Sequence, residues 1–317
     1  LHLSIRRQRQ MCIRDSVNTA KPVLKWAGGK SQLLSQLNEL LPPKLKVNAI
    51  NTYIEPFVGG GAMFFNLCKM YDFKNVYLFD TNRELIILYN AIKHDVKLLI
   101  EELNHISNEY FSLSEQDRDK YYYLRRDEYN SFSKEINVNT YNTQFIRRAA
   151  LTIFINRTCF NGLYRVNSKN KFNVPVGKYK NPRILDDKNL LNVSEALQIA
   201  EIRHCDFSET LKYADKDTFI YYYPPYRPIS KTSAFNSYSA EDFNDDEQRR
   251  LKKLFDECHK KGALQMESNS DPTNYIEDLF FDDLYSNYKI HRVNATRIIN
   301  SNAEKRGVIR ELVITNY

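Results

Sequence analysis

The chain alternates between two hydrophobic periodicities, which together predict an α/β architecture. Apolar residues recur with helical spacing over residues 33–41, 62–70 and 245–260. Short runs of β-branched and aromatic residues occupy 53–57, 76–79 and 219–223, and residues 263–268 are a further possible strand. The first pattern predicts amphipathic helices and the second predicts strands. Residues 280–293 and 310–316 indicate a further helix and edge strands.

A glycine-rich turn follows the first predicted strand. Gly59-Gly60-Gly61 leads into the helix at 62–70, and the next strand ends in Asp80. Glycine lets a ligand approach the backbone because no Cβ intrudes. An acidic residue about twenty positions later is placed to bond ribose hydroxyls. This βαβ pattern is typical of nucleotide-binding folds, although dehydrogenases and purely structural turns share it.

The middle of the chain differs from its two ends in composition and periodicity. Residues 96–199 are rich in Tyr, Asn, Arg and Lys, with helical periodicity near 145–155 and a basic, turn-rich loop over 156–182. We expect an inserted helical domain here. The α/β pattern on either side then forms one catalytic domain, from residues 17–95 and 200–317.

Charge and composition are compatible with nucleic-acid binding. The net charge is +7, but residues 1–16 contribute four arginines and one aspartate, so +4 remains without them. Residues 11–16 resemble translated adaptor sequence, and we interpret 1–16 as a non-native leader. No apolar run approaches the roughly 18 residues of a membrane helix. The five cysteines form no C-x-x-C pair, which favours free thiols in a reducing cytoplasm.

Several spaced motifs resemble the Dam-type family of DNA adenine-N6 methyltransferases (alpha-class), especially members that modify GATC. The matching motifs are Lys25-Trp26-Ala27-Gly28-Gly29-Lys30, Glu55-Pro56-Phe57-Val58-Gly59-Gly60-Gly61, residues 160–167 and 172–175, Pro224-Pro225-Tyr226 and Ser268-Asn269-Ser270. They follow the family's order over residues 20–317. The resemblance implies a Rossmann-like methyltransferase sheet with helices on both faces and an inserted target-recognition domain.

The resemblance also implies S-adenosylmethionine (SAM) as cofactor and no metal. The matching cofactor positions are Trp26, Lys30, Glu55, Phe57, Gly59, Asp80, Asp206 and Phe207. An aromatic face can contact the sulfonium or adenine, and an ammonium can contact the carboxylate. Structural alternatives stay open, because Trp26 also fits a core aromatic, Lys30 a solvated lysine and Asp206 a loop cap.

The loop at 156–182 is the expected reader of double-stranded DNA. Positions that match the residues used around GATC are Phe160, Asn161, Leu163, Arg165, Pro175 and Lys178. Relatives usually carry arginine at the position of Lys178. A lysine keeps the charge but loses the bidentate fork to guanine. A solvated basic loop without DNA contacts is the alternative.

The catalytic motif departs from the family at one position. Relatives have Asp-Pro-Pro-Tyr, whereas this chain has Tyr223-Pro224-Pro225-Tyr226. The resemblance implies that the aspartate and a prolyl carbonyl accept hydrogen bonds from a flipped adenine, on which the tyrosine stacks. A phenol keeps its proton at neutral pH and is larger than a carboxymethyl group. Losing one preorganised partner typically costs about 3–4 kcal/mol, so we expect little or no activity.

The strand at 263–268 carries a second departure. Gln265 and Glu267 share one face of an expected buried strand. An unpaired buried carboxylate costs several kcal/mol or shifts its pKa. The strand is therefore expected to be an exposed edge or to have drifted from selection, and a sequence error stays open for both departures.

The leading hypothesis is a site-specific adenine-N6 methyltransferase acting on duplex DNA as a cytoplasmic monomer, with a restriction endonuclease in the same system as a possible companion. The first alternative is an inactive relative that still binds SAM or DNA. The second is a dinucleotide-dependent oxidoreductase built on the same βαβ unit, which does not require the basic aromatic loop or Pro224-Pro225-Tyr226.

Overall fold

The computed structural model describes residues 19–26, 32–131, 136–227, 243–274, 277–296 and 308–317 of the chain. Lys30 and the predicted leader at 1–16 lie outside the described residues. The α-helices are α2 (Leu34–Glu39), α3 (Pro43–Lys46), α4 (Ala62–Met70), α5 (Arg83–Ser112), α6 (Glu115–Ser131), α7 (Gln144–Thr158), α8 (Asp187–Leu197), α9 (Asp245–Lys260) and α10 (Phe280–Leu284). Short 3-10 helices occupy η3 (Phe160–Gly162), η4 (Phe207–Lys212) and η6 (Pro272–Asn274).

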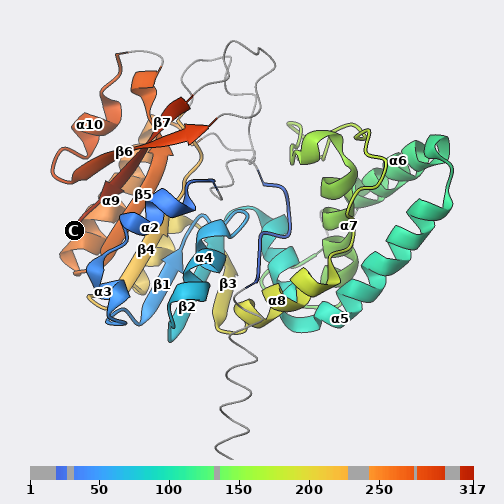
Figure 1. Ribbon diagram of the computed structural model, residues 1–317, viewed down its shortest axis with the longest axis horizontal. Helices are drawn as coiled ribbons and strands as arrows, with labels where there is room; N and C mark the ends of the chain where they lie inside the picture. Colours follow the sequence, from blue (N-terminus) through green and yellow to red (C-terminus); the bar gives the residue numbers. More distant parts are fainter. Residues whose placement is uncertain (1–18, 27–31, 132–135, 228–242, 275–276, 297–307) are drawn as a thin grey trace, which may run out of the picture.

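Seven strands form one mixed sheet (Figure 1). The strands are β1 (Thr52–Glu55), β2 (Asn75–Asp80), β3 (Ala200–His204), β4 (Thr218–Tyr222), β5 (Leu264–Ser270), β6 (Lys289–Thr296) and β7 (Val308–Thr315). Their order is β3-β2-β1-β4-β5-β7-β6, with the first five parallel. Strand β7 runs antiparallel to both neighbours. The prediction that 310–316 is an edge strand is therefore wrong, because β6 covers the outer side of β7.

The order of the strands fixes where a ligand site can form. The chain proceeds from β1 outward to β2 and β3, and later from β4 in the other direction to β5. The strand order therefore reverses between the neighbours β1 and β4. In open α/β sheets, ligands bind at the carboxyl ends of the strands beside such a switch point.

Apolar side chains alternate between the two faces of the sheet and are covered on both. Tyr53 and Tyr221 belong to one buried cluster, to which α2, α4, α5 and α8 contribute. The adjacent Ile54 and Tyr222 belong to a second cluster, with α9 and α10. Because successive strand residues point to opposite faces, both faces require apolar residues and helical cover. The predicted arrangement of helices on both faces is confirmed.

Local sequence explains where the elements begin and end. The predicted helices at 62–70 and 245–260 match α4 and α9 residue for residue. Asn244 caps α9 because its side chain accepts hydrogen bonds from the Asp246 and Glu247 backbone N–H groups. Strand β4 ends at Tyr222, one residue short of the prediction. Two prolines follow Tyr223, and proline cannot donate to a ladder.

Helices α5, α6 and α7 form a helical part beside the β3 edge of the sheet (Figure 1). Helix α5 runs from the sheet into this part and has non-helical backbone angles at Asp95. Within it, Arg148 of α7 is 2% exposed and pairs with Glu84 of α5 at 2.6 Å. The division of the chain into 17–95, 96–199 and 200–317 stays a prediction, and the kink at Asp95 falls at its first boundary.

The expectation that Gln265 and Glu267 lie on an exposed edge strand is wrong. Strand β5 is no exposed edge, because it lies between β4 and β7. Both side chains are fully buried, and both are hydrogen-bonded. The Tyr222 hydroxyl donates to Gln265 Oε1 at 2.9 Å, and the Tyr285 hydroxyl donates to Glu267 Oε2 at 2.6 Å. The polar face of β5 is therefore a buried network whose side chains are hydrogen-bonded.

Candidate cofactor and DNA site

Predicted site residues gather at the carboxyl edge of the sheet. The turn after β1 contains Phe57 and Gly59, while Asp80 ends β2. Asp206 follows β3, and the turn 223–226 follows β4. We call this turn the catalytic turn after the role that the family resemblance predicts for it. Residues far apart in the sequence thus reach the same edge beside the β1–β4 switch point.

The glycine turn and Asp80 form one hydrogen-bonded unit. The backbone N–H of Gly59 donates to Asp80 Oδ2 at 2.9 Å, and that of Asn82 donates to Oδ1 at 2.8 Å. Burial raises the pKa of Asp80 to about 6, against these two hydrogen bonds, which lower it. A carboxylate has about four acceptor positions, so each oxygen keeps capacity for a ligand hydroxyl.

Trp26 packs directly over the glycine turn. A Cβ on Gly60 would lie 3.2 Å from the Trp26 Cβ, and one on Gly59 would lie 3.2 Å from its ring. Gly61 precedes α4 at φ 70°, where a Cβ would lie 2.9 Å from the Phe65 ring. The three glycines thus allow a close approach that larger residues would prevent. The half-buried indole of Trp26 therefore lies directly against the glycine turn.

Asp206 and Phe207 lie beside an aromatic cluster. The Phe57 and Phe207 ring centroids are 5.3 Å apart, and Phe243 lies within 5.9 Å of both. The Arg250 guanidinium bonds both Asp206 oxygens at 2.7 and 2.8 Å. The Arg250 hydrogen bonds hold the pKa of Asp206 at about 2. Asp206 also caps η4 through the Ser208 N–H, so the loop-cap alternative describes part of its role.

Glu55 faces the interior beneath this edge. Its side chain is buried and accepts a hydrogen bond of 2.7 Å from the Tyr53 hydroxyl. Burial raises the pKa of Glu55 to about 8, although bonds from Tyr53 and the Phe64 backbone oppose the shift. The carboxyl group is therefore mostly neutral at pH 7, and it lies at the end of β1, just before the turn that contains Phe57 and Gly59.

The catalytic turn is held from below by α9. Gln248 Nε2 donates to the carbonyl of Pro225 at 3.3 Å. The rings of Tyr223 and Tyr226 stand edge to face, with centroids 5.7 Å apart. A third ring between them would need roughly 7–8 Å, twice the 3.5–4.0 Å separation of packed carbons. No base therefore fits between these two rings in this arrangement.

The predicted DNA-reading loop begins within α7, which ends at Thr158. The name recognition loop is used below for the part after this helix, residues 159–182, which doubles back on itself. Isolated β-bridges join Cys159 to Val176 and Val166 to Phe172. Side chains alternate along both arms, with buried anchors at Tyr164, Val166, Phe172 and Val174. All six predicted DNA-binding residues are exposed: Phe160, Asn161, Leu163, Arg165, Pro175 and Lys178. The fold thus presents them together on the solvent side of one structure.

Two contacts tie the recognition loop to the segment with Trp26. The Tyr164 and Trp26 ring centroids are 4.9 Å apart. The buried amide of Asn156 accepts from Lys25 N at 2.8 Å and donates to the carbonyls of Lys25 and Gly162, both at 3.0 Å. The cofactor-side segment and the turn of the recognition loop are therefore fixed to each other.

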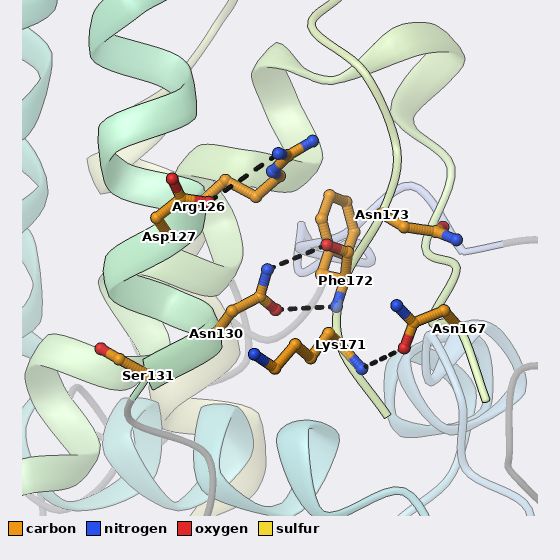
Figure 2. Close-up of a pocket in the computed structure, with 8 residues that line it drawn as sticks. All are labelled: Arg126, Asp127, Asn130, Ser131, Asn167, Lys171, Phe172 and Asn173. Carbon is orange, nitrogen blue, oxygen red and sulfur yellow. Dashed lines mark hydrogen bonds and ion pairs between the residues drawn. The ribbon is translucent and has the colours of Figure 1, made fainter. Parts of the chain in front are cut away.

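A polar hollow of about 380 Å³ lies between α6 and the recognition loop (Figure 2). It is lined by Arg126, Asp127, Asn130, Ser131, Asn167, Lys171, Phe172 and Asn173. The Asn130 amide holds the Phe172 backbone at both its N–H and its carbonyl. The hollow belongs to the helical part rather than to the carboxyl edge, so the cofactor positions lie elsewhere.

Comparison with known proteins decides the family. Residues 26–299 match the sequence profile of the D12 class N6 adenine-specific DNA methyltransferases. The Type II methyltransferase M.MjaIII of Methanocaldococcus jannaschii is 48% identical over 298 residues, which cover 94% of this chain and 99% of that protein. The chain belongs to this family.

Other members of the family align over nearly the same length. The Type II methyltransferase M1.LlaDCHI of Lactococcus lactis subsp. cremoris is 38% identical, covering 94% of this chain and 95% of that protein. A DNA adenine methylase of Haemophilus influenzae is 34% identical, covering 92% of each. The predicted resemblance and the methyltransferase fold class are confirmed, and the oxidoreductase alternative finds no support.

Three residues at the methyltransferase edge were not predicted from the sequence: Phe243, Gln248 and Arg250. Gln248 did carry a signal, because it lies on the apolar face of α9 with Leu251 and Phe255. A polar residue on such a face needs a buried partner.

Among the described residues, no group of three potential metal ligands and no helix able to cross a membrane is found.

Proposed function

We propose that this chain is built to transfer a methyl group from SAM to N6 of an adenine flipped out of duplex DNA, with GATC as the target. One observation carries the proposal: the Gly59–Asp80 unit and the catalytic turn meet at the β1–β4 switch point. We also propose that Tyr223 leaves the natural chain with little or no turnover.

The cofactor side of the edge suits SAM, which supplies an electrophilic methyl group on its sulfonium sulfur. Asp80 would accept hydrogen bonds from the ribose hydroxyls, using the acceptor capacity left by Gly59 and Asn82. Trp26 would offer an aromatic face to the cation or the adenine. Lys30, outside the described residues, is proposed to meet the methionine carboxylate. The rings beside Asp206 would exclude water from the adenine.

On the base side, the catalytic turn would hold the flipped adenine. A prolyl carbonyl from Pro224 or Pro225 would accept a hydrogen bond from the amino group, and Tyr226 would stack on the ring. The aspartate of the family would accept a second hydrogen bond. Tyr223 is a weaker acceptor, and its ring already packs edge to face on Tyr226. Both effects reduce transfer.

The recognition loop would position the duplex and read the base edges. Arg165 is exposed and bonds Asn173 Oδ1 at 2.8 Å, which orients its guanidinium. An arginine presented in this way can form the bidentate contact with guanine. The exposed lysines around it would contact phosphates, which set orientation without carrying sequence information.

A direct test compares the natural chain with its Tyr223→Asp variant. Both full-length proteins are incubated with tritium-labelled SAM and either a GATC duplex or a scrambled duplex. We expect the variant to transfer methyl groups about 100- to 1,000-fold faster, the range for restoring one preorganised partner. Calorimetric titration with SAM reports cofactor binding separately.

Each outcome separates the possible functions. Equal rates in both proteins would refute the role of Tyr223. Transfer to both duplexes by the variant would refute GATC specificity. SAM binding without transfer by either protein would favour the alternative of an inactive relative that binds ligands. Failure of both proteins to bind SAM would overturn the cofactor assignment.

The wider setting is also a proposal. Relatives named Type II methyltransferase support a place in a restriction–modification system, with a companion endonuclease that need not contact this chain. We propose action as a monomer in the cytoplasm. The four described cysteines are free thiols, which is compatible with a reducing compartment.

A further inference from the structure

A chain of buried side chains connects Glu267 to the catalytic turn. Asn269 Nδ2 donates to Glu267 Oε1 and to Gln248 Oε1, both at 3.2 Å. Gln248 Nε2 in turn donates to the Pro225 carbonyl at 3.3 Å. At the far end, the Tyr285 hydroxyl donates to Glu267 Oε2 at 2.6 Å. Glu267, Asn269 and Gln248 are each fully buried, so water does not compete with the contacts among these three side chains. The contact of Gln248 with the Pro225 carbonyl is partly buried.

The order of donors and acceptors along this chain follows from the carboxyl group. Glu267 Oε1 accepts, so Asn269 must turn its NH₂ group toward it. Asn269 Oδ1 then faces the backbone, where it accepts from Ser270 N at 2.9 Å. Because the same NH₂ group also reaches Gln248 Oε1, the Gln248 NH₂ group is left facing Pro225. The single acceptor Glu267 Oε1 thereby determines the orientation of both the Asn269 and the Gln248 amide.

The consequence for the active site is a fixed peptide plane. The Pro225 carbonyl belongs to the peptide bond that leads into Tyr226. A donor held beneath that carbonyl fixes the plane of this peptide, because the bond itself is planar. The start of the Tyr226 backbone is therefore fixed as well. Reversing the Gln248 amide would place an oxygen against the carbonyl and remove the hydrogen bond.

We propose that Glu267, Asn269 and Gln248 act as positioning residues for methyl transfer, orienting the Pro225–Tyr226 peptide from the buried side of β5 and α9. The inference rests on the proposed function for its kinetic consequence. Its structural consequence is that these hydrogen-bonded side chains hold the catalytic turn, and this can be measured without any methyl transfer. Glu267, the unexpected residue of β5, then has a role in the site.

The test uses full-length variants in the Tyr223→Asp background. Glu267→Leu and Gln248→Leu break the chain at its two ends. Glu267→Gln keeps an acceptor for Asn269 and a partner for Tyr285. The matched control is Gln265→Leu, which removes a buried, hydrogen-bonded amide from the same face of β5 without a link to Pro225. Thermal unfolding identifies any variant that is not folded at the assay temperature.

The first readout is hydrogen exchange in the peptide that contains Tyr226 and Arg227. We expect exchange to accelerate at least about threefold in Glu267→Leu and Gln248→Leu, and to stay unchanged in Glu267→Gln and Gln265→Leu. Unchanged exchange in both folded leucine variants at positions 267 and 248 would overturn the inference. This readout requires neither SAM nor DNA.

The second readout is the rate of methyl transfer. We expect kcat to fall about 10- to 100-fold in both leucine variants, the scale of a displacement near 1 Å, with the KM for SAM within about twofold. Glu267→Gln should restore kcat. A kcat equal to that of Gln265→Leu would refute the kinetic role. A parent that transfers no methyl group would refute the proposed function, while hydrogen exchange still decides the inference.

Discussion

The two halves of the carboxyl edge differ in how closely they follow the methyltransferase family. The half at β1 and β2 keeps the expected glycine turn and Asp80, joined by a 2.9 Å hydrogen bond. The half at β4 and β5 carries both departures, Tyr223 and Glu267. The departures differ in kind, because Tyr223 lies at the catalytic turn and Glu267 in the interior.

The interiors of the two halves nevertheless use the same arrangement. Glu55 under the first half and Glu267 under the second are buried carboxyl groups, each bonded by a tyrosine hydroxyl within 2.7 Å. Burial raises both pKa values, to about 8 and about 7. The comparison teaches that the support beneath the second half is intact, and that Tyr223 alone carries the expected loss of chemistry.

The largest expected effect is on the pH dependence of stability. Because both pKa values lie above the usual value of glutamate, the neutral forms favour folding, and this contribution is present below about pH 4.5. It is lost as the pH rises through 7 for Glu267 and through 8 for Glu55. Urea unfolding should show that Glu267→Gln and Glu55→Gln each gain stability at pH 9, on the order of 3–5 kcal/mol, but almost nothing at pH 5.

The control for this experiment is Glu101→Gln, at an exposed position on α5. It should change stability little at either pH. The parallel between the two halves breaks if one glutamine variant gains stability at pH 9 and the other loses it. In that case one carboxylate is stabilised in its charged form.

A smaller effect is expected on cofactor affinity. Asp80→Asn replaces an oxygen that accepts a backbone N–H with an NH₂ group, so the turn and a ribose hydroxyl lose an acceptor. Calorimetry should show SAM binding about 30-fold weaker, near the 2 kcal/mol typical of a hydrogen bond to a charged group. Asp206→Asn should weaken binding less than about fivefold, because both Asp206 oxygens already bond Arg250 and neither holds the glycine turn. Equal losses would show that the β2 half has no special role.

The smallest effect concerns a departure outside the sheet. Lys178 is exposed, and the family resemblance predicts an arginine at this position. Lys178→Arg should improve discrimination of GATC from a single-mismatch duplex about 3- to 10-fold, because the guanidinium fork can bind guanine with two hydrogen bonds. Lys169→Arg, also on the exposed loop, is the matched control. Improvement in both variants would indicate a general phosphate effect instead.

Sequence periodicity was sufficient to predict strands at β1, β2, β4 and β5 and the helices α4 and α9, because alternation and helical spacing reflect burial directly. It predicted no strand at β3 and placed β7 at an edge. It was misleading for β5, where polar residues suggested exposure although Tyr222 and Tyr285 bond them in the interior. Partners on other elements are invisible to a local pattern. For the same reason, the Arg250 contact with Asp206 and the Gln248 contact with Pro225 required the tertiary structure.

Exposed and buried side chains alternate along the recognition loop, so that different residues serve DNA contact, as proposed, and the stability of the fold. Arg165 points to solvent, while its neighbours Tyr164 and Val166 are anchored in the core. Point substitutions at the outward positions should therefore change the proposed DNA contacts without weakening the fold. A single-residue insertion would exchange the two faces and damage both properties at once. New specificities in such a loop should thus evolve by replacement rather than by changes in length.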